Sequence, residues 1–503
     1  MSTTSIKSKA IRGIAWSLAD KLINQIGFLA VTLYIAAKIG PESFGLIGML
    51  TIFMLLAESI INSGFSQALI QRSDEITEED ASTVFYINIF WAVGIYVALY
   101  FSAPLIASFY NQELLVDISR VLFLVILTNA MSVVVRAKLT INLDFKSQTI
   151  ASVVATISSS VLAIYLVLHN FDYWAIVYMI LSKSIITTFI LWIFCKWIPQ
   201  SAFSYKSFKS LFKFGSNLMI AGFIATFVNN LYIALIGRYF NASSVGYFTQ
   251  ATNLSNALSS LISSTLQGVT YPIMTSVKND RERLLSIYKQ LISITMLVSL
   301  PALVGFAAVA DNFVQLFLGQ EWVSAIPILV ALSFARTITP ISAINLNILN
   351  AIGRSDLFLK VDLSKLPLTL GALFLALPYG IEAIAWSITA TSAIAFFINA
   401  YYPYKLFGLG SIVNKVIGTL PIIRRLCLRN YIVARSMKDV GLANPSATIL
   451  IPCRNEEGNI KDAIIRLPEF CDDMEILYVE GGSSDDTLAE IHRVIEEYQD
   501  KDI

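Results

Sequence analysis

LYIAAKIGPESFG, residues 33–45, ends one long apolar segment and begins the next, and it decides the fold. Gly40 and Pro41 stand between apolar runs that extend back to Ile14 and forward to Ile70. A bilayer core needs about 20 apolar residues per helix, so each run is long enough to cross a membrane. The stretch therefore predicts two membrane helices joined by a short turn.

The chain continues in the same way up to Tyr402. Hydrophobic residues make up 56% of its 503 residues and charged residues only 14%, whereas a soluble globular chain has roughly 25% charged residues. These features predict an all-α polytopic membrane protein with about twelve transmembrane helices. The predicted helices are 14–37, 45–70, 83–109, 115–135, 148–168, 172–195, 211–237, 246–276, 284–310, 323–351, 357–377 and 381–402.

Composition also limits the classes of function. The four cysteines form no C-x-x-C pair, and the two histidines, His169 and His492, lie far apart in the sequence. Because metal sites draw on clustered cysteine and histidine, we expect neither a metal site nor a cofactor. The net charge of +1 gives no bias toward nucleic acid.

Lysine and arginine are distributed unevenly between alternate loops. Arg136 and Lys138, for example, lie in a loop of the basic set, whereas the other set holds little beyond Lys38, Arg120 and Arg238. Positive residues accumulate on the cytoplasmic side of a membrane. The sequence therefore predicts a multi-pass protein of the cell inner (cytoplasmic) membrane, with the N-terminus and the C-terminal tail both in the cytoplasm.

The opening stretch has a partner about 200 residues later, LYIALIGRYFNASSVG at residues 231–246. The offset corresponds to six predicted helices, an even number, so both halves enter the membrane in the same direction. We therefore expect two six-helix lobes, residues 1–202 and 203–404, related by an axis along the membrane normal. A substrate cavity is expected between such lobes.

Ionisable residues near the middle of predicted helices are candidates for the wall of that cavity, because a charge facing lipid is costly. Lys183 and Arg336 are expected to face the substrate. Glu58 and Asp20 are the candidates for ion coupling, since a small cation needs only a compact carboxylate site.

Some of these residues have a simpler explanation that the sequence leaves open. Asp20 lies close enough to the cytoplasmic edge for its charge to reach water. Asp362 and Lys365, three residues apart on one helical face, could simply pair with each other.

The predicted helix 246–276 carries a polar stripe within about a third of its circumference. Its members are Gln250, Asn253, Asn256, Ser260, Ser264 and Gln267. Such a stripe suits a hydrated cavity wall, although polar side chains also link neighbouring helices. Asn229, Asn230 and Asn345 are expected to line the same space. A sugar or a diphosphate needs many hydrogen-bond partners and some positive charge to leave water.

The chain changes character after the last predicted helix. Residues 405–445 mix arginines with apolar residues and read as a basic interfacial linker, although 406–423 could be another membrane segment. Residues 446–503 alternate apolar strand patterns with helical ones. They predict a short cytoplasmic α/β fragment.

Several stretches resemble Wzx-type polysaccharide and O-antigen unit flippases of the multidrug/oligosaccharidyl-lipid/polysaccharide exporter superfamily. They are IGPESFGLIGM (39–49), GFSQALIQRSDEITEEDASTVFYINI (64–89), RAKLTINLDFKSQT (136–149), FKFGSNLMIAG (212–222) and SSVGYFTQATNLS (243–255). The resemblance covers about residues 1–404. It fits the family well but does not identify the sugar.

The resemblance implies a transporter rather than an enzyme. Such a protein moves an undecaprenyl-pyrophosphate-linked oligosaccharide across the cytoplasmic membrane by alternating access, for O-antigen, capsule or exopolysaccharide biosynthesis. Membrane lipid and a glycosyltransferase or polymerase of the same pathway are the implied partners. A cation-coupled multidrug-type exporter and a membrane-anchored glycosyltransferase remain as alternatives.

IPCRNEE (451–457) and VEGGSSDDT (479–487) resemble the start of a family 2 glycosyltransferase. The resemblance implies a vestigial nucleotide-sugar site at Pro452, Arg454, Glu480 and Asp485, although that family more often has aspartate where Glu480 stands. About 58 residues are too few for the usual fold of that family. We therefore expect this fragment to be truncated and inactive.

Overall fold

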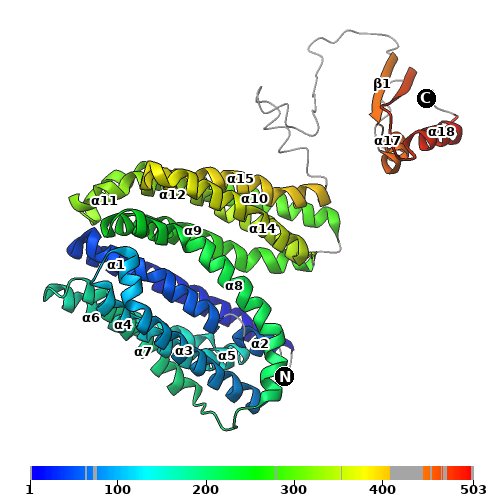
Figure 1. The fold of residues 1–503 in the computed structure, drawn as a ribbon. Helices are drawn as coiled ribbons and strands as arrows, with labels where there is room; N and C mark the ends of the chain where they lie inside the picture. Colours follow the sequence, from blue (N-terminus) through cyan, green and yellow to red (C-terminus); the bar gives the residue numbers. More distant parts are fainter. Residues whose placement is uncertain are drawn as a thin grey trace. The chain divides into compact units, whose positions relative to one another are not determined.

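Figure 1 shows a bundle of long helices followed by a smaller part that contains strands. The chain divides into two compact units, Met1–Ile412 and Val413–Ile503. The computed structural model describes residues 3–62, 65–71, 76–277, 280–352, 354–407, 446–453, 456–465, 467 and 473–499.

The helices of the first unit form at the apolar segments, because inside a bilayer the backbone must satisfy its own hydrogen bonds. Residues 1–202, called the first half below, contain α1 (Thr3–Asn62), α2 (Phe65–Gln71), α3 (Glu78–Tyr110), α4 (Leu115–Leu122), α5 (Leu124–Ile141), α6 (Phe145–Leu168) and α7 (Tyr173–Cys195). Residues 203–404, the second half, are covered by α8 (Tyr205–Tyr239), α9 (Ala242–Ser276), α10 (Arg281–Ala308), α11 (Ala310–Phe317), η1 (Gln320–Ala325), α12 (Ile326–Thr337), α13 (Thr339–Ala351), α14 (Ser355–Ala376), η2 (Leu377–Tyr379) and α15 (Ile381–Phe407).

Every predicted membrane helix coincides with one of these helices or with a part or a consecutive run of them. The predicted all-α polytopic fold is therefore confirmed. The helices of the first half lie together, as do α9 to α15, and α8 extends from one group to the other (Figure 1). Most of the predicted linker 405–445 lies outside the described residues, and so does most of the alternative span 406–423.

The helix α1 breaks at Gly40, where the sequence predicted a turn. Gly40 has φ 77° and ψ 173°, a conformation that glycine adopts far more readily than other residues. Before the break, Gln25 donates to the carbonyl of Ala257 over 3.0 Å; after it, Gly48 faces Thr249. Both parts of α1 thus run along α9 away from the same end, and the chain reverses there. We call this end of the bundle the Gly40 end.

Nine helical stretches of the described residues are long and apolar enough to cross a membrane. The first of them, Ile23–Ile61, runs through Gly40 and so contains both predicted helices of the opening stretch. The nine do not include α8 and α9, the two helices that carry the predicted asparagines and the polar stripe. The chain is a multi-pass membrane protein.

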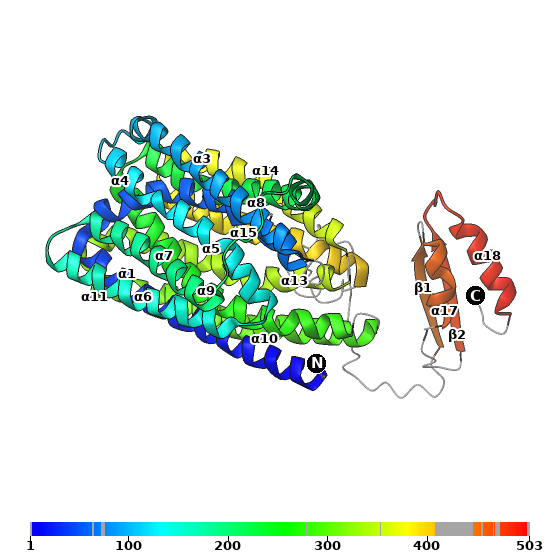
Figure 2. The same ribbon diagram turned by 90° about the horizontal axis from the view of Figure 1, so that it is seen from below.

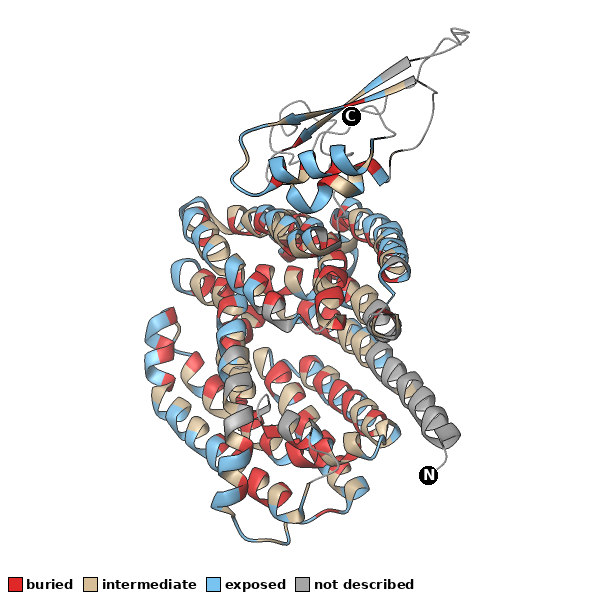
Figure 3. Cartoon of the chain, turned by 90° about the vertical axis from the view of Figure 1, so that its right-hand side faces the viewer, coloured by how far each residue is buried: buried red, intermediate tan, exposed pale blue. Residues whose placement is uncertain are grey.

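The outer faces of the helices are apolar as well as exposed. Figure 3 shows buried residues facing the interior of the bundle and exposed ones on its outside. Phe90 on α3 is 76% exposed and Leu297 on α10 is 75% exposed. Large apolar side chains on an outer surface are costly in water but favourable in lipid. This surface fits a bundle that is surrounded by a bilayer.

Two short helices and two breaks were not predicted. The chain divides at Phe123 between α4 and α5, and at Ile338 between α12 and α13. Pro340 stands in the first turn of α13, where its missing N–H costs nothing. The helices α4 and α11 have eight residues each, far fewer than the roughly 20 that cross a bilayer. A prediction that looks for membrane-spanning lengths therefore does not find them as separate helices.

The second unit contains β1 (Ser446–Cys453) and β2 (Asp473–Glu480), which pair in parallel with Leu450 opposite Leu477. The helices α17 (Ile460–Ile465) and α18 (Thr487–Glu497) lie beside the strands (Figure 2). Ile460, Ile476 and Ile491 are buried together between strands and helices. The predicted α/β fragment is confirmed as a fold.

Candidate functional site

A cavity of about 540 Å³ lies among α8, α9, α12, α14 and α15, all of them helices of the second half. We call it the pocket. Its polar lining residues are Asn229, Asn230, Tyr232, Thr252, Asn256, Arg336, Asp362, Lys365, Thr369, Thr391 and Ser392. The remaining lining residues are apolar, so the polar groups stand in a wall that otherwise suits a membrane interior.

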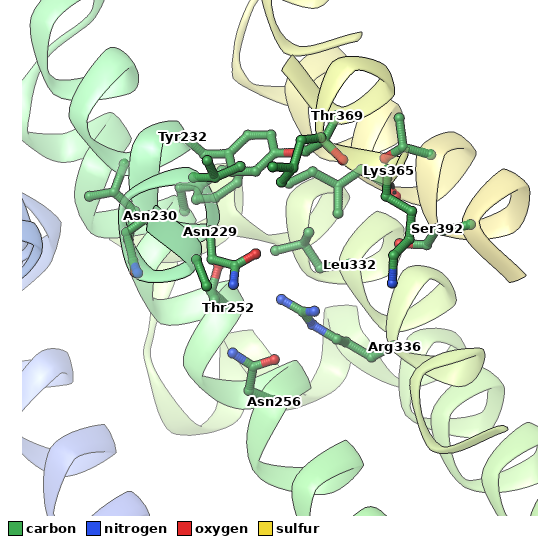
Figure 4. Close-up of a pocket in the computed structure, with 18 of the residues that line it drawn as sticks. Asn229, Asn230, Tyr232, Thr252, Asn256, Leu332, Arg336, Lys365, Thr369 and Ser392 are labelled. Atoms are coloured by element: carbon green, nitrogen blue, oxygen red, sulfur yellow. Dashed lines mark hydrogen bonds between the residues drawn. The ribbon is translucent and has the colours of Figure 1, made fainter. Parts of the chain in front are cut away.

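Four polar side chains from four helices point into the same space. Figure 4 shows Asn229 of α8, Asn256 of α9, Arg336 of α12 and Lys365 of α14 directed toward it. Asn230, the neighbour of Asn229, donates instead to the carbonyl of Thr226 in its own helix over 2.8 Å. The pocket therefore combines amide groups with two positive charges.

Arg336 carries a charge that the described residues do not compensate. Its Nε atom is shielded from solvent and has no hydrogen-bond partner, and the ion pairs found among the described residues do not include it. Its main-chain carbonyl accepts a hydrogen bond of 3.3 Å from the hydroxyl of Ser259. A guanidinium with a shielded, unpartnered Nε atom and no counter-charge among the described residues is costly, and a bound anion would reduce that cost.

The second cation is already paired. The ammonium of Lys365 lies 2.6 Å from the Asp362 carboxylate and donates to Oδ1 of Asn399 over 3.0 Å. The pair suggested by the sequence thus forms, and both of its members also line the pocket. With the charges of Lys365 and Asp362 cancelled, Arg336 leaves the pocket with one net positive charge.

Replacing Lys365 by methionine should lower the yield of folded protein more than replacing the whole pair. In Lys365→Met the Asp362 carboxylate loses its counter-ion at the pocket wall, whereas Lys365→Met/Asp362→Asn removes both charges. Size-exclusion chromatography after heating measures the folded fraction. Lys360→Met, at an exposed position of the same helix, is the control. Equal losses in the single and double variants would contradict this account of the pair.

Among the described residues, Gln250 and Asn253 of the predicted polar stripe and Asn345 of α13 are not part of the pocket lining. Gln250 is completely buried, and neither polar atom of its amide group has a hydrogen-bond partner among the residues that the structure describes. Asn253 is exposed, and the side chain of Gln267 lies outside the described residues. Asn345 is buried and accepts a hydrogen bond from the hydroxyl of Tyr288 over 2.5 Å, so it links α13 to α10.

Two predicted residues of the first half, Lys183 and Glu58, contact other residues of that half. The ammonium of Lys183 lies 4.4 Å from the ring centroid of Phe28. Glu58 accepts a hydrogen bond of 2.6 Å from Asn129, which in turn accepts one of 2.6 Å from Ser184. Lys183 is not among the residues that line the pocket. A shared cavity for Lys183 and Arg336 stays a prediction.

The side chain of Asp20 lies outside the described residues. Its role in ion coupling also stays a prediction.

Sequence reasoning missed part of the lining. Asp362, Lys365 and Thr369 are spaced so that one face of α14 presents all three to the pocket. That spacing was visible in the sequence. The hydroxyls of Thr391 and Ser392 on α15 gave no comparable signal, because single hydroxyls are common in membrane helices.

The acidic residues of the C-terminal fragment make local hydrogen bonds. Glu480 accepts from the backbone N–H of Ser483 over 2.5 Å. Asp485 accepts from the hydroxyl of Thr487, and this bond lowers the pKa of the Asp485 carboxyl group. Pro452 is exposed at the end of β1, and Arg454 lies outside the described residues. The glycosyltransferase-like site and its inactivity stay predictions.

The sequence and the fold are both similar to those of known proteins. The teichuronic acid biosynthesis protein TuaB of Bacillus subtilis is 29% identical over 354 residues, which are 69% of this chain and 72% of TuaB. The succinoglycan biosynthesis transport protein ExoT of Rhizobium meliloti is 24% identical, over 91% of this chain and 93% of ExoT.

A solved structure of the lipid II flippase MurJ, in an inward closed conformation, superimposes with a TM-score of 0.62. Sequence identity is 15%, over 84% of this chain and 94% of the MurJ chain, so the likeness concerns the fold. The family model for polysaccharide biosynthesis proteins matches residues 35–327, more than half of the chain. The chain therefore belongs to the polysaccharide biosynthesis protein family.

Proposed function

We propose that this protein is a flippase that moves lipid-linked oligosaccharides across the cytoplasmic membrane by alternating access. The observation that carries the proposal is the pocket, where Arg336 brings an uncompensated charge into a wall of amides and hydroxyls. Amides and hydroxyls replace the water around a sugar, and a guanidinium binds phosphate through paired hydrogen bonds. A purely apolar cargo would need neither.

The relatives support the same function. TuaB and ExoT are both proteins of polysaccharide biosynthesis, and ExoT is a transport protein. The shared fold with MurJ supports a transporter rather than an enzyme. A role in building a cell-surface polysaccharide follows from these likenesses together with the pocket.

The finer parts of the proposal concern the carrier and the orientation. We take the carrier to be undecaprenyl pyrophosphate, with both termini of the protein in the cytoplasm and the Gly40 end at the outer surface. The residues proposed to contact the substrate in the pocket are Arg336, Asn229, Asn230 and Asn256. Contact of the substrate with Lys183, Gln250, Asn253, Gln267 and Asn345 stays a prediction. A diphosphate moving outward gains about 2.3 kcal/mol per charge for each 100 mV of membrane potential. The potential therefore assists export.

Cells without the gene should lose their surface polysaccharide and accumulate its lipid-linked precursor in the cytoplasmic leaflet. Lectin labelling of intact and permeabilised cells distinguishes the two leaflets, and analysis of extracted lipid measures the precursor. Restoring the gene should reverse both effects. Normal polysaccharide with no accumulated precursor would contradict the proposal.

A cation-coupled multidrug-type exporter is the second candidate, favoured by the hydrogen-bonded Glu58 in the first half. An exporter would show drug-stimulated ion flux in proteoliposomes, and Glu58→Gln would abolish it. A flippase would instead move fluorescent lipid-linked sugar between leaflets, and this movement would depend on Arg336.

A further inference from the structure

The two halves meet closely at a pair of glycines near the Gly40 end. A Cβ atom added to Gly45 would lie 1.8 Å from the backbone oxygen of Ala242, and one added to Gly246 would lie 2.0 Å from that of Pro41. Both obstacles are backbone atoms, which no change of side-chain rotamer can move. To accept either methyl group, the helices would have to separate by more than about 1 Å.

The two contacts are reciprocal. Gly45 and Gly246 end the two copies of the sequence repeat, and each lies against the residue four positions before the other glycine, Ala242 and Pro41. Reciprocal contacts of this kind are typical of two like units related by a two-fold axis. The axis between the halves therefore passes beside this glycine pair.

Other contacts join the first half to the second half near the same end. Trp322 is fully buried, and its indole N–H donates to the carbonyl of Ala36 across the halves over 3.2 Å. A Cβ atom at Gly237 of α8 would lie 2.6 Å from the ring of Tyr110 of α3. Arg238 donates to the carbonyl of Phe109 over 2.9 Å. The two halves are therefore packed against each other at this end.

The same region contains polar atoms that closure leaves without partners. Thr249 Oγ1 and both polar atoms of the Gln250 side chain are shielded from solvent and have no hydrogen-bond partner in the described part of the chain. Thr249 lies directly against Gly48 of the other half. Gln250 stands one turn after Gly246 on α9 and so shares that face of the helix. Burial of unpaired polar groups opposes closure, and separation of the halves would return Thr249 and, from its place on this face, Gln250 to water. At this one contact, the close packing of the glycines stabilises the closed arrangement of the halves, and the unpaired polar groups destabilise it.

We propose that the reciprocal contact of Gly45 and Gly246 is the gate that closes the transport path at the Gly40 end, and that Thr249 and Gln250 favour its opening. The proposal rests on the proposed function, since alternating access requires such a gate. With the proposed orientation, the gate faces the outside of the cell.

The gate can be tested by thiol accessibility, which needs no substrate. Val245→Cys places a probe at a completely buried position beside Gly48. A membrane-impermeant maleimide is added to intact cells or right-side-out vesicles. The chain without the Val245→Cys substitution is labelled in parallel, to measure the background from its four natural cysteines. The probe should be labelled slowly in the otherwise native chain. Gly45→Ala and Gly246→Ala should each accelerate labelling at least about tenfold, because the closed state loses its packing.

Gly27→Ala is the matched control, since Gly27 lies in the same helix as Gly45 and has no atom within 4 Å of an added Cβ. Labelling of Gly45→Ala and Gly246→Ala at the rate of Gly27→Ala would overturn the proposal. Thr249→Val and Gln250→Leu form an independent arm, in which removal of the unpaired groups should slow labelling.

If the alanine variants do not fold, the Thr249→Val and Gln250→Leu variants decide. Labelling of Val245→Cys at the same rate with and without these substitutions would then overturn the proposal. Accelerated and slowed labelling as described, in a protein that moves no glycolipid, would leave the gate standing while the proposed function fails.

Discussion

Replacing Arg336 by glutamine should reduce polysaccharide export by between about tenfold and a hundredfold while the protein stays folded. Hydrogen bonds to a charged group contribute about 1.5–3 kcal/mol, which corresponds to a change of that size in binding. Glutamine retains hydrogen-bonding groups but removes the charge. Because the described residues hold no ion pair with Arg336, its loss leaves no carboxylate without a counter-ion.

Arg336→Lys separates the charge from the shape of the guanidinium. Lysine keeps the positive charge but lacks the planar fork that binds phosphate through two parallel hydrogen bonds. We therefore expect export between that of the native protein and that of Arg336→Gln. Surface polysaccharide per cell measures export, and immunoblotting of membranes checks the amount of protein.

Arg120→Gln is the matched control for this experiment. Arg120 is partly buried and, like Arg336, has a shielded Nε atom without a hydrogen-bond partner among the described residues. Its guanidinium carbon lies 4.6 Å from the centroid of the Tyr100 ring. It is not among the residues lining the pocket. Native export by Arg336→Gln, or equal losses in the Arg336 and Arg120 variants, would show that the pocket does not bind the substrate's anion.

Replacing Trp322 by alanine should destabilise the membrane unit by about 3–5 kcal/mol, the usual cost of removing a large buried aromatic side chain. Trp322 is the largest of the fully buried side chains of the described residues. Its ring packs edge-on against Phe44, at 5.8 Å between centroids, and against Tyr247, at 5.9 Å. The substitution removes these contacts and the hydrogen bond to Ala36.

Thermal unfolding of the purified protein in lipid nanodiscs measures this effect. Trp386→Ala is the control, because Trp386 is 48% exposed and contacts Phe334 from the outer face at 6.2 Å. The midpoint should fall markedly for Trp322→Ala and little for Trp386→Ala. Similar midpoints for the two variants would mean that Trp322 does not hold the halves together.

The membrane helices could be predicted because their length and composition follow from the thickness and polarity of the bilayer. The turn at Gly40 could also be predicted, since glycine and proline interrupt a long apolar run. What the pattern could not show was the division at Phe123 or the short helix α11, because both depend on packing against other helices.

The pocket was only partly predictable. Asn256 lines the pocket, whereas Asn253, one turn away on the same stripe, is exposed. A stripe that covers about a third of a helix faces more than one neighbour, and the sequence does not say which neighbour lies where. Asn345 shows the same limit, because its partner Tyr288 lies on another helix. The place of Arg336 in the pocket lining could be predicted, because an arginine near the middle of a membrane helix needs polar surroundings.

The reciprocity of the glycine contacts has a genetic consequence. In a dimer of identical six-helix chains, one codon would specify both contacts, and any substitution would alter them together. In this chain the codons for Gly45 and Gly246 are separate, although each residue meets the backbone beside the other. Selection can therefore adjust the packing of the two halves at this contact in two independent steps rather than in a single doubled one.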